Sequence, residues 1–139
     1  MTKIRLLLLA VLVFATTAVF ADDVAVIVNS SAKVSEVSSS DLRDVFNGEK
    51  TSLAGGVHVS PVTLKGGPAH EAFLKTHVGK SDSAFRASWR SLVFTGQGTM
   101  PKTFETEAAL IDYVAATPGA IGYVSRSANR DKVKTLVVK

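Results

Sequence analysis

The apolar positions of this chain form short β-branched runs that alternate with stretches at helical spacing. Val24–Val28 is a continuous apolar run, which is typical of a strand covered on both faces. Strand character returns over Val57–Leu64 and, near the C-terminus, over Ile121–Val124 and Val133–Val138. Pro61 interrupts the first of these three runs. We expect that strand to lie at an edge or a bulge, because proline lacks the N–H that a ladder needs.

Helical signals fill the intervals between these runs. Capping serines and threonines, and a proline at a first helical position, mark where helices begin. In one segment Phe85, Trp89 and Val93 recur at the spacing of a single helix face. The predicted helices are Asp41–Phe46, Pro68–Val78, Asp82–Phe94 and a last one that Thr106 caps, with Leu110, Ile111 and Val114 on its buried face. The element order β-α-β-α-α-α-β-β predicts an α/β fold.

The N-terminus has the pattern of a secretory signal peptide. Lys3 and Arg5 precede the apolar stretch Leu6–Phe14, and Ala21 ends the segment, in the order of a charged region, an apolar region and a cleavage site. We expect residues 1–21 to be a cleaved signal and residues 22–139 to form one exported domain. The alternative is an uncleaved membrane anchor, but the uncharged stretch is shorter than the ~20 residues that span a bilayer.

Composition excludes several classes of function. The chain has no cysteine, which excludes disulfides, thiol catalysis and thiolate metal sites. Its net charge of +4 would fall by two on removal of Lys3 and Arg5. The remaining basic residues do not cluster as a nucleic-acid partner requires, and Arg86 and Arg90 are expected on a solvated helix face.

Catalytic and metal-binding motifs are absent as well. The chain has neither a G-x-S-x-G elbow nor a G-x-x-x-x-G-K-[ST] loop, so we predict that it is not an enzyme and has no cofactor. His70 and His77 are seven residues apart, about 10.5 Å along a helix, which is too far for two ligands of one metal ion.

Several motifs resemble those of phosphate-type periplasmic solute-binding proteins of ABC uptake systems. They are Asp41–Lys50 (DLRDVFNGEK), Ala72–Leu74 (AFL), Val93–Gly96 (VFTG) and Pro118–Val124 (PGAIGYV), in the family's order and spacing. The resemblance implies an α/β fold that is a single periplasmic-binding-protein-like lobe, with a small mixed sheet flanked by helices. It also implies a periplasmic location, a phosphate-like oxyanion as ligand, and an ABC transporter membrane component or self-association as partner.

The resemblance places an anion-binding loop before the second helix. In larger members a Ser hydroxyl, a Gly amide and a Thr hydroxyl hold the anion there. The matching residues in this chain are Thr63–Ala69, which lack those hydroxyls and an arginine, and Pro68 removes one amide. Lys65 and the amides of a helix start still attract an anion, and a plain strand-to-helix turn is the alternative. The candidate residues here are Lys65, Gly66, Gly67, Ala69 and His70.

Two further segments are candidates for ligand contact. Asn29, Ser30 and Ser31 follow the first strand, where α/β sheets often place ligands, and an ordinary polar turn is the alternative. Thr95 and Gly96 open a glycine-rich loop that continues to Pro101; it is either a ligand or partner loop or a flexible connector. Two functions stay open: reversible oxyanion binding, or an accessory module that contacts a protein partner through the Thr95–Pro101 surface.

Overall fold

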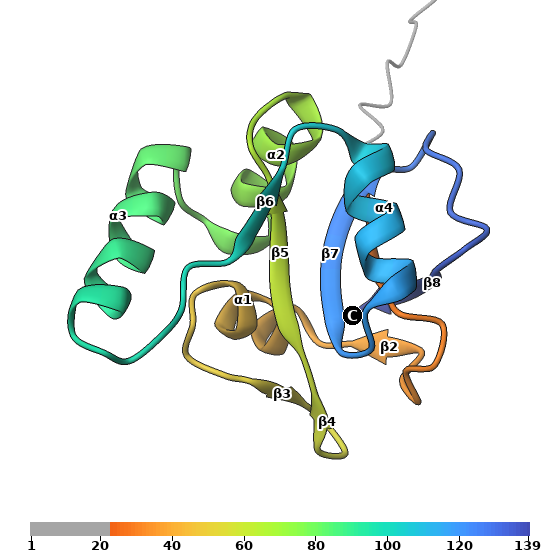
Figure 1. Cartoon of the computed structure of the whole chain (residues 1–139), viewed down its shortest axis with the longest axis horizontal. Helices are drawn as coiled ribbons and strands as arrows, with labels where there is room; N and C mark the ends of the chain where they lie inside the picture. The colour runs from red at the N-terminus through yellow and green to blue at the C-terminus, as the bar shows by residue number, and fades with distance from the viewer. Residues whose placement is uncertain (1–22) are drawn as a thin grey trace, which may run out of the picture.

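A six-stranded mixed sheet organises the molecule (Figure 1). The computed structural model describes residues 23–139, so the predicted signal peptide lies outside the described residues. The strand order is β2-β8-β1-β7-β5-β6. The strands are β1 (Val24–Val28), β2 (Glu36–Val37), β5 (Ser60–Leu64), β6 (Lys102–Phe104), β7 (Ala120–Ser125) and β8 (Lys134–Val138).

The sheet is mixed because β1 runs against its neighbours. β1 is antiparallel to both β7 and β8, whereas β5 is parallel to β7 and to β6. Val28 at the end of β1 and Pro61 near the start of β5 both pair with Ile121. The C-terminal ends of β1 and β5 therefore lie at opposite ends of the sheet.

The predicted helices are confirmed, and their caps are those that the sequence indicates. Ser38, Ser81 and Thr106 each accept the N–H of the residue three positions on, and Pro68 occupies the first turn of its helix. The final turn of the second helix widens into a π-helix, η1. The helices are α1 (Ser39–Phe46), α2 (Pro68–Phe73), η1 (Leu74–Val78), α3 (Asp82–Phe94) and α4 (Glu107–Ala116).

The helices cover both faces of the sheet. A Cβ added at Gly122 would meet Leu110 of α4, whereas the ring of the next residue, Tyr123, stacks on Phe73 of α2 with centroids 3.9 Å apart. Successive strand residues point to opposite faces, so α4 lies on one face and α2 on the other. In Figure 1, α3 lies beyond the β6 edge.

Two details of the strand prediction are wrong. Val57–Leu64 is two strands: Val57–His58 (β4) pairs with Ser52–Leu53 (β3) in a separate hairpin, and β5 begins at Ser60. Also, β5 lies inside the sheet, between β7 and β6. Pro61 is tolerated there because the β6 ladder begins only at Val62.

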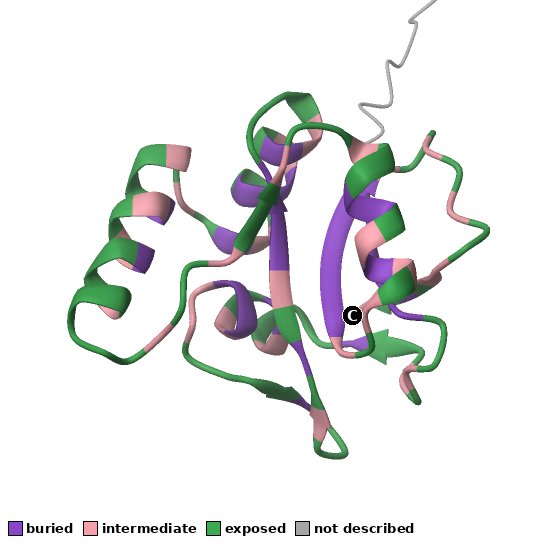
Figure 2. Ribbon diagram, in the orientation of Figure 1, coloured by how far each residue is buried: buried purple, intermediate pink, exposed green. Residues whose placement is uncertain are grey.

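The core lies around the neighbouring central strands β1 and β7, and Figure 2 shows the β7 ribbon as buried along most of its length. All of β1 is buried, as is β7 up to Val124. Phe46 packs edge-on against Phe73 and Tyr123, so aromatic rings join α1 and α2 to the sheet. None of the helices in residues 23–139 has the length and apolarity needed to cross a membrane.

Candidate functional site

The predicted anion loop links the end of β5 to the start of α2. Lys65, Gly66, Gly67 and Pro68 are exposed, Ala69 is half-buried and His70 is buried. Gly67 has a φ of 95°, which is the conformation that glycine supplies at low cost. The chain can therefore turn sharply from strand to helix and leave the first turn of α2 open to solvent.

Three backbone amides of this loop have no hydrogen-bond acceptor. Within residues 23–139, the N–H groups of Gly66, Gly67 and Ala69 donate to no protein acceptor, as expected for groups that precede or begin a helix. The loop itself is fixed, because the Lys65 N–H donates to Phe104 O at 2.8 Å and the Glu71 N–H donates to Gly67 O at 3.1 Å. Free donors on a fixed backbone are suited to an anion.

Buried hydrogen bonds connect the two ends of the loop to β7 and α3. The Leu64 N–H donates to the Tyr123 hydroxyl at 3.1 Å, and the same hydroxyl bonds to Nδ1 of His70. His70 Nε2 lies 2.6 Å from Oδ1 of Asp82. Because an ionised carboxylate only accepts hydrogen bonds, Nε2 carries the hydrogen that Asp82 accepts. Both ring nitrogens of His70 are thus hydrogen-bonded inside the protein.

Arg86 closes this network on the α3 side. Its Nε donates to both carboxylate oxygens of Asp82, at 3.0 and 2.9 Å, and its Nη2 donates to Lys65 O at 2.6 Å. Partial burial raises the pKa of Asp82, but hydrogen bonds from Arg86 and His70 outweigh it, so the pKa of this carboxyl lies below its ordinary value. The expectation that Arg86 is only a solvated surface residue is wrong.

The charge around the loop is balanced. Nζ of Lys65 lies 3.3 Å from Oε1 of Glu105, and both side chains are largely exposed, so the pair is worth at most about 1 kcal/mol. The Arg86 charge is matched by Asp82. An anion at the loop would therefore compete with Glu105 for the Lys65 ammonium. The three amides would attract the anion without such competition.

The turn after β1 lies at the far end of the sheet from the loop. Asn29 is buried; its Nδ2 donates to Val114 O at 2.8 Å and to Ala115 O at 3.1 Å, and its Oδ1 accepts from the N–H and hydroxyl of Ser31. Ser30 is exposed. The Asn29 side chain thus bonds the last carbonyls of α4, and β1 directs this turn away from Lys65.

Thr95 and Gly96 lie at the other end of α3 from the loop. Arg86 contacts Lys65, and Thr95 follows nine residues later, about 13 Å along a helix axis. The Thr95 hydroxyl donates back to Ser91 O and Leu92 O. The structure therefore does not bring together the three predicted groups of ligand residues. The participants that the sequence reasoning missed are Asp82, Arg86 and Tyr123, whose role depends on contacts between distant segments.

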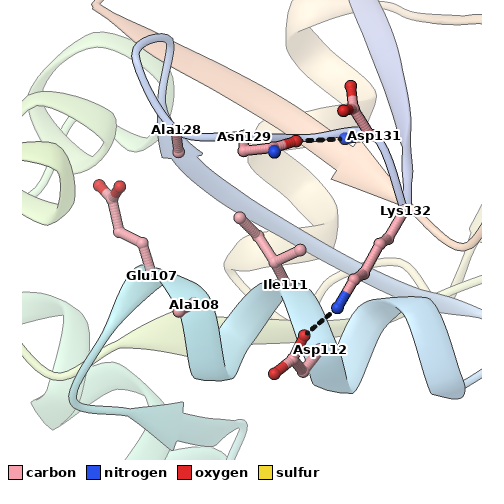
Figure 3. A pocket seen from close by; sticks show the side chains of 8 residues that line it. All are labelled: Glu107, Ala108, Ile111, Asp112, Ala128, Asn129, Asp131 and Lys132. Atoms are coloured by element: carbon pink, nitrogen blue, oxygen red, sulfur yellow. Dashed lines mark hydrogen bonds and ion pairs between the residues drawn. The ribbon is translucent and has the colours of Figure 1, made fainter.

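A separate pocket of about 550 Å³ lies between α4 and the β7–β8 connection (Figure 3). Ile111 forms part of its apolar floor. Glu107 accepts from the N–H and hydroxyl of Ser125, and Asp112 pairs with Lys132 at 3.3 Å. None of the predicted ligand residues lines this pocket. Among residues 23–139, no group of His, Asp and Glu side chains is placed to hold a metal ion.

Comparison with known proteins identifies the fold. No family model matches this chain, and no curated protein matches it in sequence. Solved structures do match, each over 84% of this chain. A protein from Clostridium perfringens, assigned as a phosphate ABC transporter substrate-binding protein and solved with bound phosphate, has a TM-score of 0.64 at 19% identity. PstS from Borrelia burgdorferi has a TM-score of 0.62 at 13% identity, and an ABC-type phosphate transport receptor from Vibrio cholerae has 0.55 at 15%.

These matches define the class of fold. The chain has the mixed α/β fold of the matched part of these phosphate transport proteins, so the predicted fold class is confirmed. It spans only 44% of the C. perfringens protein, 47% of the B. burgdorferi protein and 46% of the V. cholerae protein. At such low identities the likeness shows the fold alone.

Proposed function

We propose that this protein is an exported binding-protein lobe that binds phosphate or a similar small oxyanion at the Lys65–Ala69 loop, for ABC-type uptake. The observation that carries the proposal is the row of unpaired amides at Gly66, Gly67 and Ala69, beside the exposed ammonium of Lys65. Such amides stabilise an anion without covalent chemistry. Support also comes from the fold, which it shares with a protein solved with bound phosphate.

The proposed site is open on one side. The loop is exposed, and the chain covers less than half of each structural neighbour. A second body that faces the loop would supply further donors and exclude water, which strengthens electrostatic contacts. We propose that a second copy of the chain or a membrane component of the transporter fills this role, and that the lobe alone binds phosphate weakly.

Calorimetry with inorganic phosphate on the exported protein tests this function. We expect saturable heat, and we expect Lys65→Ala to weaken binding about three- to tenfold, the effect of losing one charge-assisted hydrogen bond in a solvated site. Lys132→Ala is the matched control, since it removes an exposed lysine paired with Asp112 and should leave the affinity unchanged. Absence of heat and of thermal stabilisation at millimolar phosphate would contradict oxyanion binding.

Export has its own test. If residues 1–21 are a cleaved signal, intact-mass measurement of protein released from the periplasm should give the mass of residues 22–139. The mass of the full chain in a membrane fraction would support the uncleaved anchor instead.

A second function, contact with a protein partner, is favoured by one observation. Phe94 at the end of α3 is 93% exposed, and Val93 and Met100 beside the same loop are also exposed. Leaving the Phe94 ring in water forgoes about 1.5–3 kcal/mol. We propose that this surface self-associates. Sedimentation should show a concentration-dependent dimer that Phe94→Ser abolishes and that Val137→Ser, at another exposed apolar residue, leaves intact.

A further inference from the structure

A second pocket lies at the opposite end of β5 from the Lys65 loop. Its volume is about 460 Å³, and it is lined by the first residues of β5 and β6, the end of α1 and the connector from Gln97 to Pro101. This volume is within the range of small-molecule sites. Because β5 runs from this pocket to the loop, the two sites lie at opposite ends of one strand.

Trp89 contacts two of the segments that line this pocket. Its indole N–H donates to Phe46 O at 2.9 Å, in a buried contact. A Cβ at Gly48 would lie 3.1 Å from the indole, and a Cβ at Gly98 would lie 3.4 Å from it. The ring is thus packed between the turn after α1 and the connector, which fixes these two segments relative to each other.

The pocket is lined by three basic side chains. They are Lys50, His58 and Lys102, and no carboxylate lines it. The Lys50 ammonium is already paired, at 2.7 Å from Asp41. Lys102 has no carboxylate partner among residues 23–139, and its Nζ lies 4.9 Å from the centroid of the Tyr113 ring. The pocket wall therefore carries one uncompensated positive charge.

The remaining lining is apolar or neutral. Trp89, Met100 and Pro101 face the same space as Lys102 and Tyr113. A cation would be repelled by Lys102, and inorganic phosphate would place its charged oxygens against the apolar part of the lining. A ligand that satisfies both parts of the lining carries one negative charge and an apolar body.

We propose that this pocket is a second binding site, which takes a small organic carboxylate with a flat apolar body. Its carboxylate pairs with Lys102, and its body lies against Met100, Pro101 and the edge of Trp89. The site is independent of the proposed oxyanion loop, with which it shares no residue.

Titration of the ¹⁵N-labelled full protein with benzoate tests this inference. Benzoate should shift the amide signals of Gly98, Thr99 and Lys102, while benzyl alcohol and benzylammonium, which keep the ring but not the negative charge, should bind at least about tenfold more weakly. Lys102→Gln should weaken benzoate binding by a similar factor. Lys132→Gln, at an exposed lysine of the other pocket, should not.

The outcomes separate the two sites. Phosphate should shift the signals of Gly66 and Gly67 in both lysine variants, whatever benzoate does. The carboxylate site is overturned if benzoate causes no saturable shifts, if benzyl alcohol binds equally well, or if Lys102→Gln retains full affinity. Loss of the phosphate shifts alone would count against the oxyanion loop and leave this pocket intact.

Discussion

The N–H of Leu64, the last residue of β5, donates a 3.1 Å hydrogen bond to the buried hydroxyl of Tyr123 on β7. The two strands pair directly only at Ser60 and Pro61, so a side-chain hydrogen bond takes the place of the ladder where β5 separates from β7. Because the same hydroxyl bonds to His70, one phenol group fixes both the end of the strand and the first turn of α2.

Tyr123→Phe should therefore destabilise the protein while preserving its packing. The change leaves the Leu64 N–H and Nδ1 of His70 without partners in the core, at a cost of about 1–3 kcal/mol in the free energy of unfolding. Denaturant titration measures it. Tyr113→Phe is the control, because the Tyr113 hydroxyl bonds to no residue in 23–139. Equal effects of the two changes would refute the role given to Tyr123.

Acid should weaken the network through Asp82. The pKa of this carboxyl is below its ordinary value of 3.8, so its contribution to stability is complete above that value and is lost as pH falls through the lower pKa of the folded state. Thermal melts between pH 5 and pH 2 should show a smaller loss of stability in Asp82→Asn than in the wild type. Asp112→Asn, at a largely exposed carboxylate, should keep the wild-type slope.

Glu105→Gln should strengthen phosphate binding. Its carboxylate lies 3.3 Å from the Lys65 ammonium and competes with a bound anion for that charge. Removal of an exposed competitor should raise the affinity about two- to fivefold, since exposed ion pairs are worth roughly 0.2–1 kcal/mol. Calorimetry at low ionic strength measures the change. A weaker affinity for phosphate would show that Lys65 needs Glu105 to be positioned.

Asn29→Ala should affect stability more than binding. The side chain bonds two carbonyls at the end of α4, and the loss of these buried bonds should cost about 1–3 kcal/mol. Ser30→Ala, at an exposed neighbour, should change the unfolding free energy by less than about 0.5 kcal/mol. A loss of phosphate affinity in Ser30→Ala would instead place ligand contacts at this turn.

A matched pair of glycine substitutions measures the packing of Trp89. Gly48 and Gly55 have φ values of 76° and 84°, so alanine costs about 1–2 kcal/mol of backbone strain at either position. Only at Gly48 would the added Cβ meet neighbours, at 2.5 Å from Leu92 and 3.1 Å from Trp89. Gly48→Ala should therefore lower the free energy of unfolding by about 1–3 kcal/mol more than Gly55→Ala does. Equal losses of unfolding free energy in the two variants would mean that Leu92 and Trp89 move aside without loss of packing.

Local sequence signals predicted much of the fold. Ser81 and Thr106 cap the helices that they were expected to cap, because a cap depends on residues within one turn. The Val24–Val28 strand follows from its own apolar run. The two-residue strands β2 and β3 were not predicted, because a strand of that length has no periodicity and exists only through its partner.

The candidate site likewise combines features that local residues predict with features that depend on contacts between distant segments. The loop of Lys65, Gly66 and Gly67 and the helix that begins at Pro68 follow from local residues alone, since glycine permits the turn and proline presets the first helical position. By contrast, the inward orientation of His70 to Tyr123 and Asp82 and the place of Asn29 at the other end of the sheet follow from the packing of distant segments. Those outcomes depend on strand order and direction, which result from burial of the whole core and are not encoded within any one segment.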